Sequence, residues 1–501
     1  MGVKKKVKQS LPYSIGISIF NLFISLFGMV YLVRYLDEIE YGAMGLFTGL
    51  PFMLNIAISL GWDNYITRFI PALEDKKEIG TKFWQILIPN MALASAICLV
   101  LVLGYDWWAT SFQIGQYKMH FIAFQGSLLS TFGFVYVQKM LNARFMQKHM
   151  LYSRIAYQAL RLGSIIWGIQ TKQDFLYFMY AFSVVDTIYF FIGIGFVVFN
   201  SALPNFRDLF RRLKETPDEK SYRRVSYVNK IGTSFLGTDI DRYVLGYFSN
   251  PTQVAIYVLA TRVLTKLMDF YPEKMFKPVS EPAFFSKYDT EESDKKEAEV
   301  NRMFQFMFNA NNIIGFLFLA ILLPLGKDFL ILVFEKDYTA DAYFPLIVFL
   351  IFLVFYSIPL GMVAQAIKKP MILLYSKLTI IFNIATGIPM AYLYGATGMA
   401  ISTAASVFLK NLMIYYMTRR HINVQIPWSS AIKSMLNTLI SAGITYGLKL
   451  AFPINLYILA VIATILYFIV MKFNPILTEP QRVVFFELVP KKVRKVVKFV
   501  F

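Results

Sequence analysis

Residues 174–199 read DFLYFMYAFSVVDTIYFFIGIGFVVF, and after its first position this run contains a single charged residue, Asp186. A helix that crosses the ~30 Å hydrocarbon core of a bilayer needs about 20 mainly apolar residues. The run is therefore long and apolar enough to cross a membrane as one helix. It predicts that the chain is a membrane protein, and the rest of the sequence repeats the pattern.

The composition of the chain points to the same class. Its 501 residues are 57% hydrophobic and 16% charged, whereas a typical soluble domain is about 25% charged. The formal net charge of +19 would suggest a nucleic-acid partner in a soluble chain. Because no soluble chain is this apolar, we expect no nucleic-acid partner and place the excess cations in the cytoplasmic loops of a polytopic membrane protein. The one cysteine, Cys98, excludes a disulfide framework.

Apolar runs of spanning length occur fourteen times, which predicts an all-α polytopic fold with about 14 transmembrane helices. They lie near 11–33, 42–70, 83–104, 119–141, 153–170, 174–199, 228–248, 253–276, 303–325, 343–367, 371–394, 397–418, 431–450 and 454–472. The first run is longer than the apolar region of a signal peptide, and no small-residue cleavage site follows it. We therefore expect it to be retained.

The distribution of cations sets the predicted orientation. With the N-terminus in the cytoplasm, 39 of the 50 Lys and Arg residues fall inside or at the inner boundary, six fall outside and five lie within spans. Cytoplasmic loops of membrane proteins carry such an excess of Lys and Arg. We therefore predict a multi-pass protein of the cytoplasmic (inner) membrane with both termini cytoplasmic.

A basic cytoplasmic stretch divides the chain. The predicted domains are an N-lobe at 1–199 (spans 1–6), a basic linker at 200–227, a C-lobe at 228–418 (spans 7–12), an extra helix pair at 419–473 (spans 13 and 14) and a basic tail at 474–501. Two six-helix lobes of equal orientation are common in transporters. The loops are too short for a catalytic domain, and no phosphate-binding loop motif occurs. We therefore expect neither an enzyme nor a cofactor.

Polar stripes run along several predicted spans. In span 8, Arg262, Lys266 and Asp269 are spaced by four and three residues, which puts them on one helical face. In span 2, Asn55, Ser59 and Asp63 are spaced by four. Charged groups at bilayer depth are costly and face a cavity or another polar stripe.

Five cations within the spans are candidate substrate ligands. We call them the cation ladder: Arg262, Lys266, Arg242, Arg68 and Arg161. Guanidinium and ammonium groups bind phosphate through charge-assisted hydrogen bonds. The alternative is that they form internal ion pairs, because five carboxylates match them in number. These are Asp63, Asp186, Asp239, Asp241 and Asp269. Asp241, Asp239, Asp63 and Asp269 are thus candidates for ion coupling or for internal salt bridges.

Other motifs give weaker signals. Asp239-Ile240-Asp241 matches the D-x-D pattern of metal-dependent glycosyltransferases, but it lies within a predicted span. His120, His149 and His421 are scattered without ligand spacing, so no metal site is expected.

Two local motifs carry a family resemblance. Residues 65–71, YITRFIP, resemble the end of span 2 in the polysaccharide flippase branch of the multidrug/oligosaccharidyl-lipid/polysaccharide exporter superfamily. Residues 241–248, DRYVLGYF, followed by IYVLA at 256–260, resemble its span 7–8 hairpin. The likeness in span number and lobe division extends over essentially the whole chain.

The resemblance implies a function. It implies two lobes around a cationic cavity that flip undecaprenyl-pyrophosphate-linked oligosaccharides, the precursors of O-antigen, capsule or exopolysaccharide, from the inner to the outer leaflet by alternating access. Its partners would be the lipid-linked substrate, membrane lipids and a polysaccharide polymerase or glycosyltransferases. The alternatives are an ion-coupled multidrug or small-molecule exporter of the same superfamily and a membrane glycosyltransferase or polysaccharide polymerase, which the short outer loops disfavour.

Overall fold

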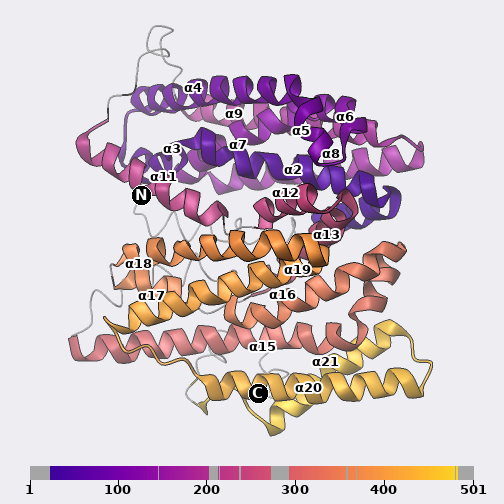
Figure 1. Cartoon of the computed structure of the whole chain (residues 1–501). Helices are drawn as coiled ribbons and strands as arrows, with labels where there is room; N and C mark the ends of the chain where they lie inside the picture. Colours follow the sequence, from indigo (N-terminus) through magenta and orange to yellow (C-terminus); the bar gives the residue numbers. More distant parts are fainter. Residues whose placement is uncertain are drawn as a thin grey trace. The chain divides into compact units, whose positions relative to one another are not determined.

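The computed structural model describes residues 23–144, 146–201, 213, 215–235, 238–271, 293–356, 359–367, 369–479 and 481–482. Helices make up nearly all of these ranges, and no strand occurs within them (Figure 1). The predicted all-α fold is confirmed. Residues 202–212 and 214 of the predicted linker, most of the tail at 474–501 and the start of span 1 lie outside the described residues.

The chain forms two compact units, Met1–Val258 and Leu259–Phe501. The first contains the helix Phe23–Tyr35, α2 (Glu38–Ser59), α3 (Trp62–Phe69), η1 (Ile70–Ala72), α4 (Lys76–Leu103), α5 (Tyr105–Ser111), η2 (Gly115–Tyr117), α6 (Lys118–Ala123), α7 (Gln125–Ala143), α8 (Gln147–Gln170), α9 (Phe175–Asn200), α11 (Pro217–Phe235) and α12 (Thr238–Phe248). The boundary between the units falls within α13 (Pro251–Met268).

The second unit continues from Leu259. It contains α15 (Ser293–Phe334), η3 (Asp337–Ala342), α16 (Tyr343–Tyr356), α17 (Leu360–Ala366), α18 (Pro370–Tyr375), η4 (Ser376–Leu378), α19 (Thr379–Arg419), α20 (Trp428–Ala451) and α21 (Leu456–Phe473). Within this unit α15 packs on α16, α20 and α21, and α16 packs on α19 (Figure 1).

Each predicted span coincides with a helix or a pair of helices in the described ranges. α19 covers two predicted spans and bends sharply at Gly395, whose φ of +55° and ψ of −134° are not helical. Glycine adopts this left-handed conformation without a Cβ clash, so the turn falls between the predicted spans at 371–394 and 397–418. Six described helices are long and apolar enough to cross a membrane, or seven if one bent pair is counted. The count of fourteen therefore stays a prediction.

Helix α20 shows how a lipid-facing helix is built. Its buried positions are mostly small and polar: Ser430, Ser434, Asn437, Thr438, Ser441 and Thr445. Its exposed face carries Ile432, Leu436, Leu439, Ile440 and Leu450. Small and hydroxyl residues let membrane helices approach closely, while the apolar face lies against lipid. The protein is a multi-pass membrane protein.

The boundary between the units differs from the predicted lobe boundary at 200–227. Helices α11 and α12 belong to the first unit because they pack on α2 and α3. The Tyr243 hydroxyl, for example, donates to the Leu46 carbonyl oxygen at 2.7 Å. Gly42 also lies so close to Pro251 that a Cβ on it would stand 2.1 Å from the Pro251 carbonyl oxygen. The assignment of spans 7 and 8 to a C-lobe stays a prediction.

Candidate functional site

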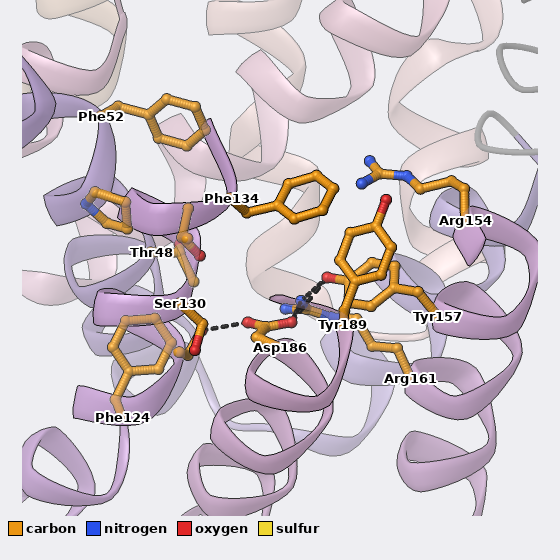
Figure 2. A pocket seen from close by; sticks show the side chains of 13 residues that line it. Thr48, Phe52, Phe124, Ser130, Phe134, Arg154, Tyr157, Arg161, Asp186 and Tyr189 are labelled. Carbon is orange, nitrogen blue, oxygen red and sulfur yellow. Dashed lines mark hydrogen bonds and ion pairs between the residues drawn. The ribbon is translucent and has the colours of Figure 1, made fainter. Parts of the chain in front are cut away.

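A cavity of about 280 Å³ lies in the first unit (Figure 2). Helices α2, α7, α8 and α9 line it together with the residue between α6 and α7. The lining residues are Thr48, Pro51, Phe52, Phe124, Ser127, Ser130, Thr131, Phe134, Arg154, Tyr157, Arg161, Asp186 and Tyr189. A water needs about 10–15 Å³ of volume measured in this way, so the cavity has room for several waters or for a small polar ligand.

Close packing of α7 on α9 forms one wall of the cavity. A Cβ on Gly133 would stand 2.4 Å from the Phe190 ring, and a Cβ on Gly193 would stand 2.7 Å from Val137. Larger residues at these two positions would push the helices apart. The Ser130 and Thr187 hydroxyls, 2.9 Å apart, link the same helices. Such contacts between small and hydroxyl residues are typical of membrane helix pairs.

A break in the helix at Phe124 gives the cavity a polar corner. α6 and α7 are bent by 52° there, and the bend leaves the Ala123 carbonyl oxygen to accept a hydrogen bond from the Ser183 hydroxyl. The backbone N–H of Ser127, in the first turn of α7, donates to Ser183 Oγ at 3.1 Å. The positive end of the α7 dipole therefore faces the region of α9 that carries Asp186.

Asp186 is the centre of a saturated network. Its Oδ1 accepts from Arg161 Nη1 and from the Tyr157 hydroxyl, each at 2.9 Å. Its Oδ2 accepts from the Ser127 hydroxyl. Figure 2 shows Arg161 and Tyr157 turned toward this carboxylate. Because Asp186 is buried and neutralises Arg161, this corner offers hydrogen bonds but little net charge.

Aromatic rings stack along the cavity. The Tyr157 and Tyr189 ring centroids are 4.4 Å apart with an interplanar angle of 27°. Phe134 lies on Tyr189 at 4.1 Å. The Arg154 guanidinium lies 5.3 Å from the Tyr157 ring centroid. An apolar wall with a few polar groups that fix orientation is typical of small-molecule sites.

A second charged cluster joins α2, α3 and α11. Lys230 Nζ donates to Asn55 Oδ1 at 3.1 Å, to Ser59 Oγ at 2.9 Å and to Asp63 Oδ2 at 3.0 Å. Asp63 and Ser59 are buried. The predicted polar stripe of span 2 thus faces a lysine of span 7.

The structure shows an internal partner for four of the five predicted carboxylates. Asp239 Oδ1 lies 3.1 Å from Arg242 Nη2 one helical turn away on α12. The buried Asp241 accepts a hydrogen bond from the Tyr257 hydroxyl, and Asp63 pairs with Lys230. Arg161 pairs with Asp186, as the alternative of internal ion pairs predicts. Whether any of these groups also binds substrate or a coupling ion stays a prediction.

The remaining predicted residues lie elsewhere. Arg68 is exposed in the last turn of α3 and does not line the cavity. Arg262 and Lys266 of α13 belong to the second unit, as does Asp269, which directly follows that helix, and all three are partly buried. A substrate role for the cation ladder as a whole therefore stays a proposal.

The aromatic and hydroxyl groups of the cavity were not predicted from the sequence. Tyr157 precedes Arg161 by four residues on α8, so the two share a helical face. Tyr189 follows Asp186 by three residues on α9. This spacing was available in the sequence, but nothing in it separates such aromatics from ordinary packing residues. Among the described residues, no group of three or more His, Cys, Asp or Glu could hold a metal ion.

Comparisons with solved structures define the class. A lipid II flippase MurJ in an inward closed conformation superposes with a TM-score of 0.73 at 15% identity, over 92% of this chain and 98% of that one. An inward-facing multidrug resistance MATE family transporter of the MOP superfamily gives 0.63 at 14% identity, over 83% and 97%. A MATE transporter from Vibrio cholerae gives 0.55 at 13% identity, over 83% and 96%. The fold is that of these membrane transporters.

The family follows from the sequence itself. A family model described as polysaccharide biosynthesis protein matches residues 7–271, which is more than half of the chain. This protein belongs to that family, and the resemblance to the polysaccharide flippase branch of the exporter superfamily is confirmed. A comparison with curated protein sequences found no match.

Proposed function

We propose that this protein flips undecaprenyl-pyrophosphate-linked oligosaccharide repeat units from the inner to the outer leaflet of the cytoplasmic membrane by alternating access. The family and the transporter fold support this proposal. In it, both termini are cytoplasmic, and the protein catalyses no reaction and needs no cofactor. A polysaccharide polymerase or glycosyltransferases would be its functional partners.

The observation that carries the proposal is the chemistry of the cavity. Tyr157, Tyr189 and Phe134 offer ring faces on which the C–H face of a sugar can stack. The hydroxyl oxygens of Ser127 and Tyr157, whose protons are donated to Asp186, can accept from sugar hydroxyls, and the guanidinium of Arg161 has N–H groups beyond Nη1 that can donate to them. A transporter for a purely apolar cargo has no need of this combination.

The pyrophosphate requires different groups. Binding it at Arg161 would compete with a partly buried ion pair, and leaving Asp186 without its cation is expensive. In our proposal the cavity binds a sugar ring, and Arg262 and Lys266 of α13 are the candidates for the phosphates. Loss of translocation in Arg262→Ala and Lys266→Ala, at normal protein levels, would support this assignment.

Translocation in proteoliposomes tests the sugar assignment. The probe is undecaprenyl pyrophosphate carrying a radiolabelled oligosaccharide, whose exposure is followed with a membrane-impermeant glycosidase. We expect Tyr189→Ala to slow translocation about 2- to 10-fold, which corresponds to the ~0.5–1.5 kcal/mol of an aromatic contact, and Tyr189→Phe to stay near the wild-type rate. Phe191→Ala is the matched control, because Phe191 is 62% exposed on the same helix.

Two results would count against these proposals. Equal translocation rates for Tyr189→Ala and the wild type would contradict the assignment of the cavity as the site that binds the sugar ring. No translocation of lipid-linked oligosaccharide by the wild-type protein, with export of small cations or drugs, would favour the multidrug exporter, whose fold is shared. In that case Asp241→Asn is expected to abolish ion-coupled efflux. Sugar transfer by the purified chain would favour the glycosyltransferase.

A further inference from the structure

The Lys230 cluster, described above, lies outside the cavity and has more oxygen atoms than its ammonium uses. The three donors of Lys230 Nζ are matched by one acceptor each from Asn55, Ser59 and Asp63. Asp63 Oδ1 is buried and finds no hydrogen-bond partner among the described residues. The hydroxyl of Tyr136 on α7, a helix that packs on α3, is also buried and without a hydrogen-bond partner in the described ranges.

The unused oxygen atoms of Asp63 and Tyr136 call for an explanation. Buried polar atoms nearly always have a hydrogen-bond partner, and each exception needs an explanation. Here the exceptions are an oxygen of a carboxylate and a hydroxyl oxygen, both ligands that hard cations prefer. The cluster therefore has coordination capacity beyond the ammonium that occupies it.

The oxygen atoms of the cluster belong to one segment of the chain, residues 55–63, whose backbone conformation is stabilised by contacts with Arg223. Asn55, Ser59 and Asp63 belong to α2 and α3, on either side of a break at Leu60 and Gly61, where φ is +45° and +83°. Arg223 of α11 fixes the break. Its Nη1 donates to the Leu60 carbonyl oxygen at 3.1 Å, and its Cζ lies 4.1 Å from the Trp62 ring centroid.

The cation comes from another helix. Lys230 is on α11, whereas the oxygen atoms that accept from it are on α2 and α3. The cluster contains a single carboxylate, so a monovalent cation neutralises it. Departure of the lysine would leave a negatively charged set of oxygens on α2 and α3.

We propose that Asn55, Ser59 and Asp63 form a binding site for a monovalent alkali cation, and that the Lys230 ammonium is the tethered occupant which such a cation replaces. Because Lys230 is part of α11, a cation that replaces its ammonium on α2 and α3 also breaks three contacts of α11, so that cation binding and the position of α11 are linked. The proposal does not depend on the identity of the transported cargo.

Thermal unfolding of the full-length protein in detergent tests the proposal. Wild type, Lys230→Met and the double variant Lys230→Met/Asp63→Asn are compared in NaCl, KCl and choline chloride at equal ionic strength. A ligand that binds only the folded state raises the unfolding temperature. We therefore expect the unfolding temperature of Lys230→Met to be a few degrees higher in NaCl or KCl than in choline chloride. The double variant, without the carboxylate, should show no such shift.

Lys449→Met is the matched control, because Lys449 also pairs with an aspartate, Asp328, in the second unit. It should unfold at the same temperature in all three salts. If Lys230→Met fails to accumulate, Lys230→Gln serves instead, since its amide can still donate to Asp63. The proposal is overturned if neither salt shifts the lysine variant, or if the double variant shifts equally. Because no cargo is present, the outcome is independent of the flippase proposal.

Discussion

The two Asp-centred ion pairs of the first unit differ in how fully their carboxylates are used. Both oxygens of Asp186 accept hydrogen bonds, from Arg161, Tyr157 and Ser127. Asp63 uses only Oδ2, toward Lys230, while Oδ1 has no hydrogen-bond partner within the described residues. The first pair is a complete part of a cavity wall, and the second has room for another ligand. Charge pairing alone therefore does not show which carboxylate can accept a further ligand, whereas the number of unused acceptor atoms does.

Removal of the carboxylate should have the largest effect at the saturated pair. Asp186→Ala removes the acceptor of three hydrogen bonds and leaves Arg161 without its counter-charge, so we expect a loss of about 3–5 kcal/mol in the free energy of unfolding. Asp63→Ala should cost about 1–3 kcal/mol, because Lys230 keeps Asn55 and Ser59 as acceptors. Denaturation of the purified variants measures both values.

Asp106→Ala is the control for that comparison. Asp106 pairs with Lys118, but the two side chains are 72% and 44% exposed. An exposed ion pair contributes about 0–1 kcal/mol. A larger cost for Asp63→Ala than for Asp186→Ala would contradict the contrast between the pairs.

Removal of one donor from the saturated pair should have a smaller effect. Ser127→Ala deletes one of three hydrogen bonds to Asp186, and we expect a loss of about 0.5–1.5 kcal/mol. Thr110→Ala, which removes an exposed hydroxyl that only donates to the backbone of Asp106, is a suitable control. Equal stability of Ser127→Ala and the wild type would show that Asp186 tolerates an unused oxygen as Asp63 does.

The smallest effect on the free energy of unfolding is expected near the Asp63–Lys230 pair. Tyr136→Phe removes a buried hydroxyl that has no hydrogen-bond partner among the described residues. Because no hydrogen bond is lost, we expect a change within about 0.5 kcal/mol or a slight gain in stability. A loss above about 1 kcal/mol would mean that this hydroxyl already has a bound partner, such as a cation or a water.

Much of the fold follows from local sequence. The turn at Gly395 separates two apolar runs, and the break at Leu60–Gly61 falls inside the predicted span 42–70 but leaves both halves helical. Hydrophobic length is a property of neighbouring residues, so the positions of the helices could be predicted. The boundary between the units could not, because it depends on the packing of α11 and α12 on α2 and α3.

The candidate functional site could be predicted only in part from the sequence. Arg161 could be predicted as an intramembrane cation and Asp186 as its possible partner, but Tyr157, Tyr189 and Ser127 carried no signal of their own. Lys230 lies in the predicted span 7, and its sequence position gave no sign of the contacts with Asn55, Ser59 and Asp63 of span 2.

The sequence by itself determined that this is an all-helical membrane protein of the polysaccharide biosynthesis family, because apolar length, charge bias and short motifs are local properties. Only the tertiary structure decided which cation meets which carboxylate. Lys230 and Asp63 are 167 residues apart, and Arg161 and Asp186 are 25 apart. Five intramembrane cations and five carboxylates allow many pairings of equal charge, and helix packing selects among them because hydrogen bonds act only over about 3 Å.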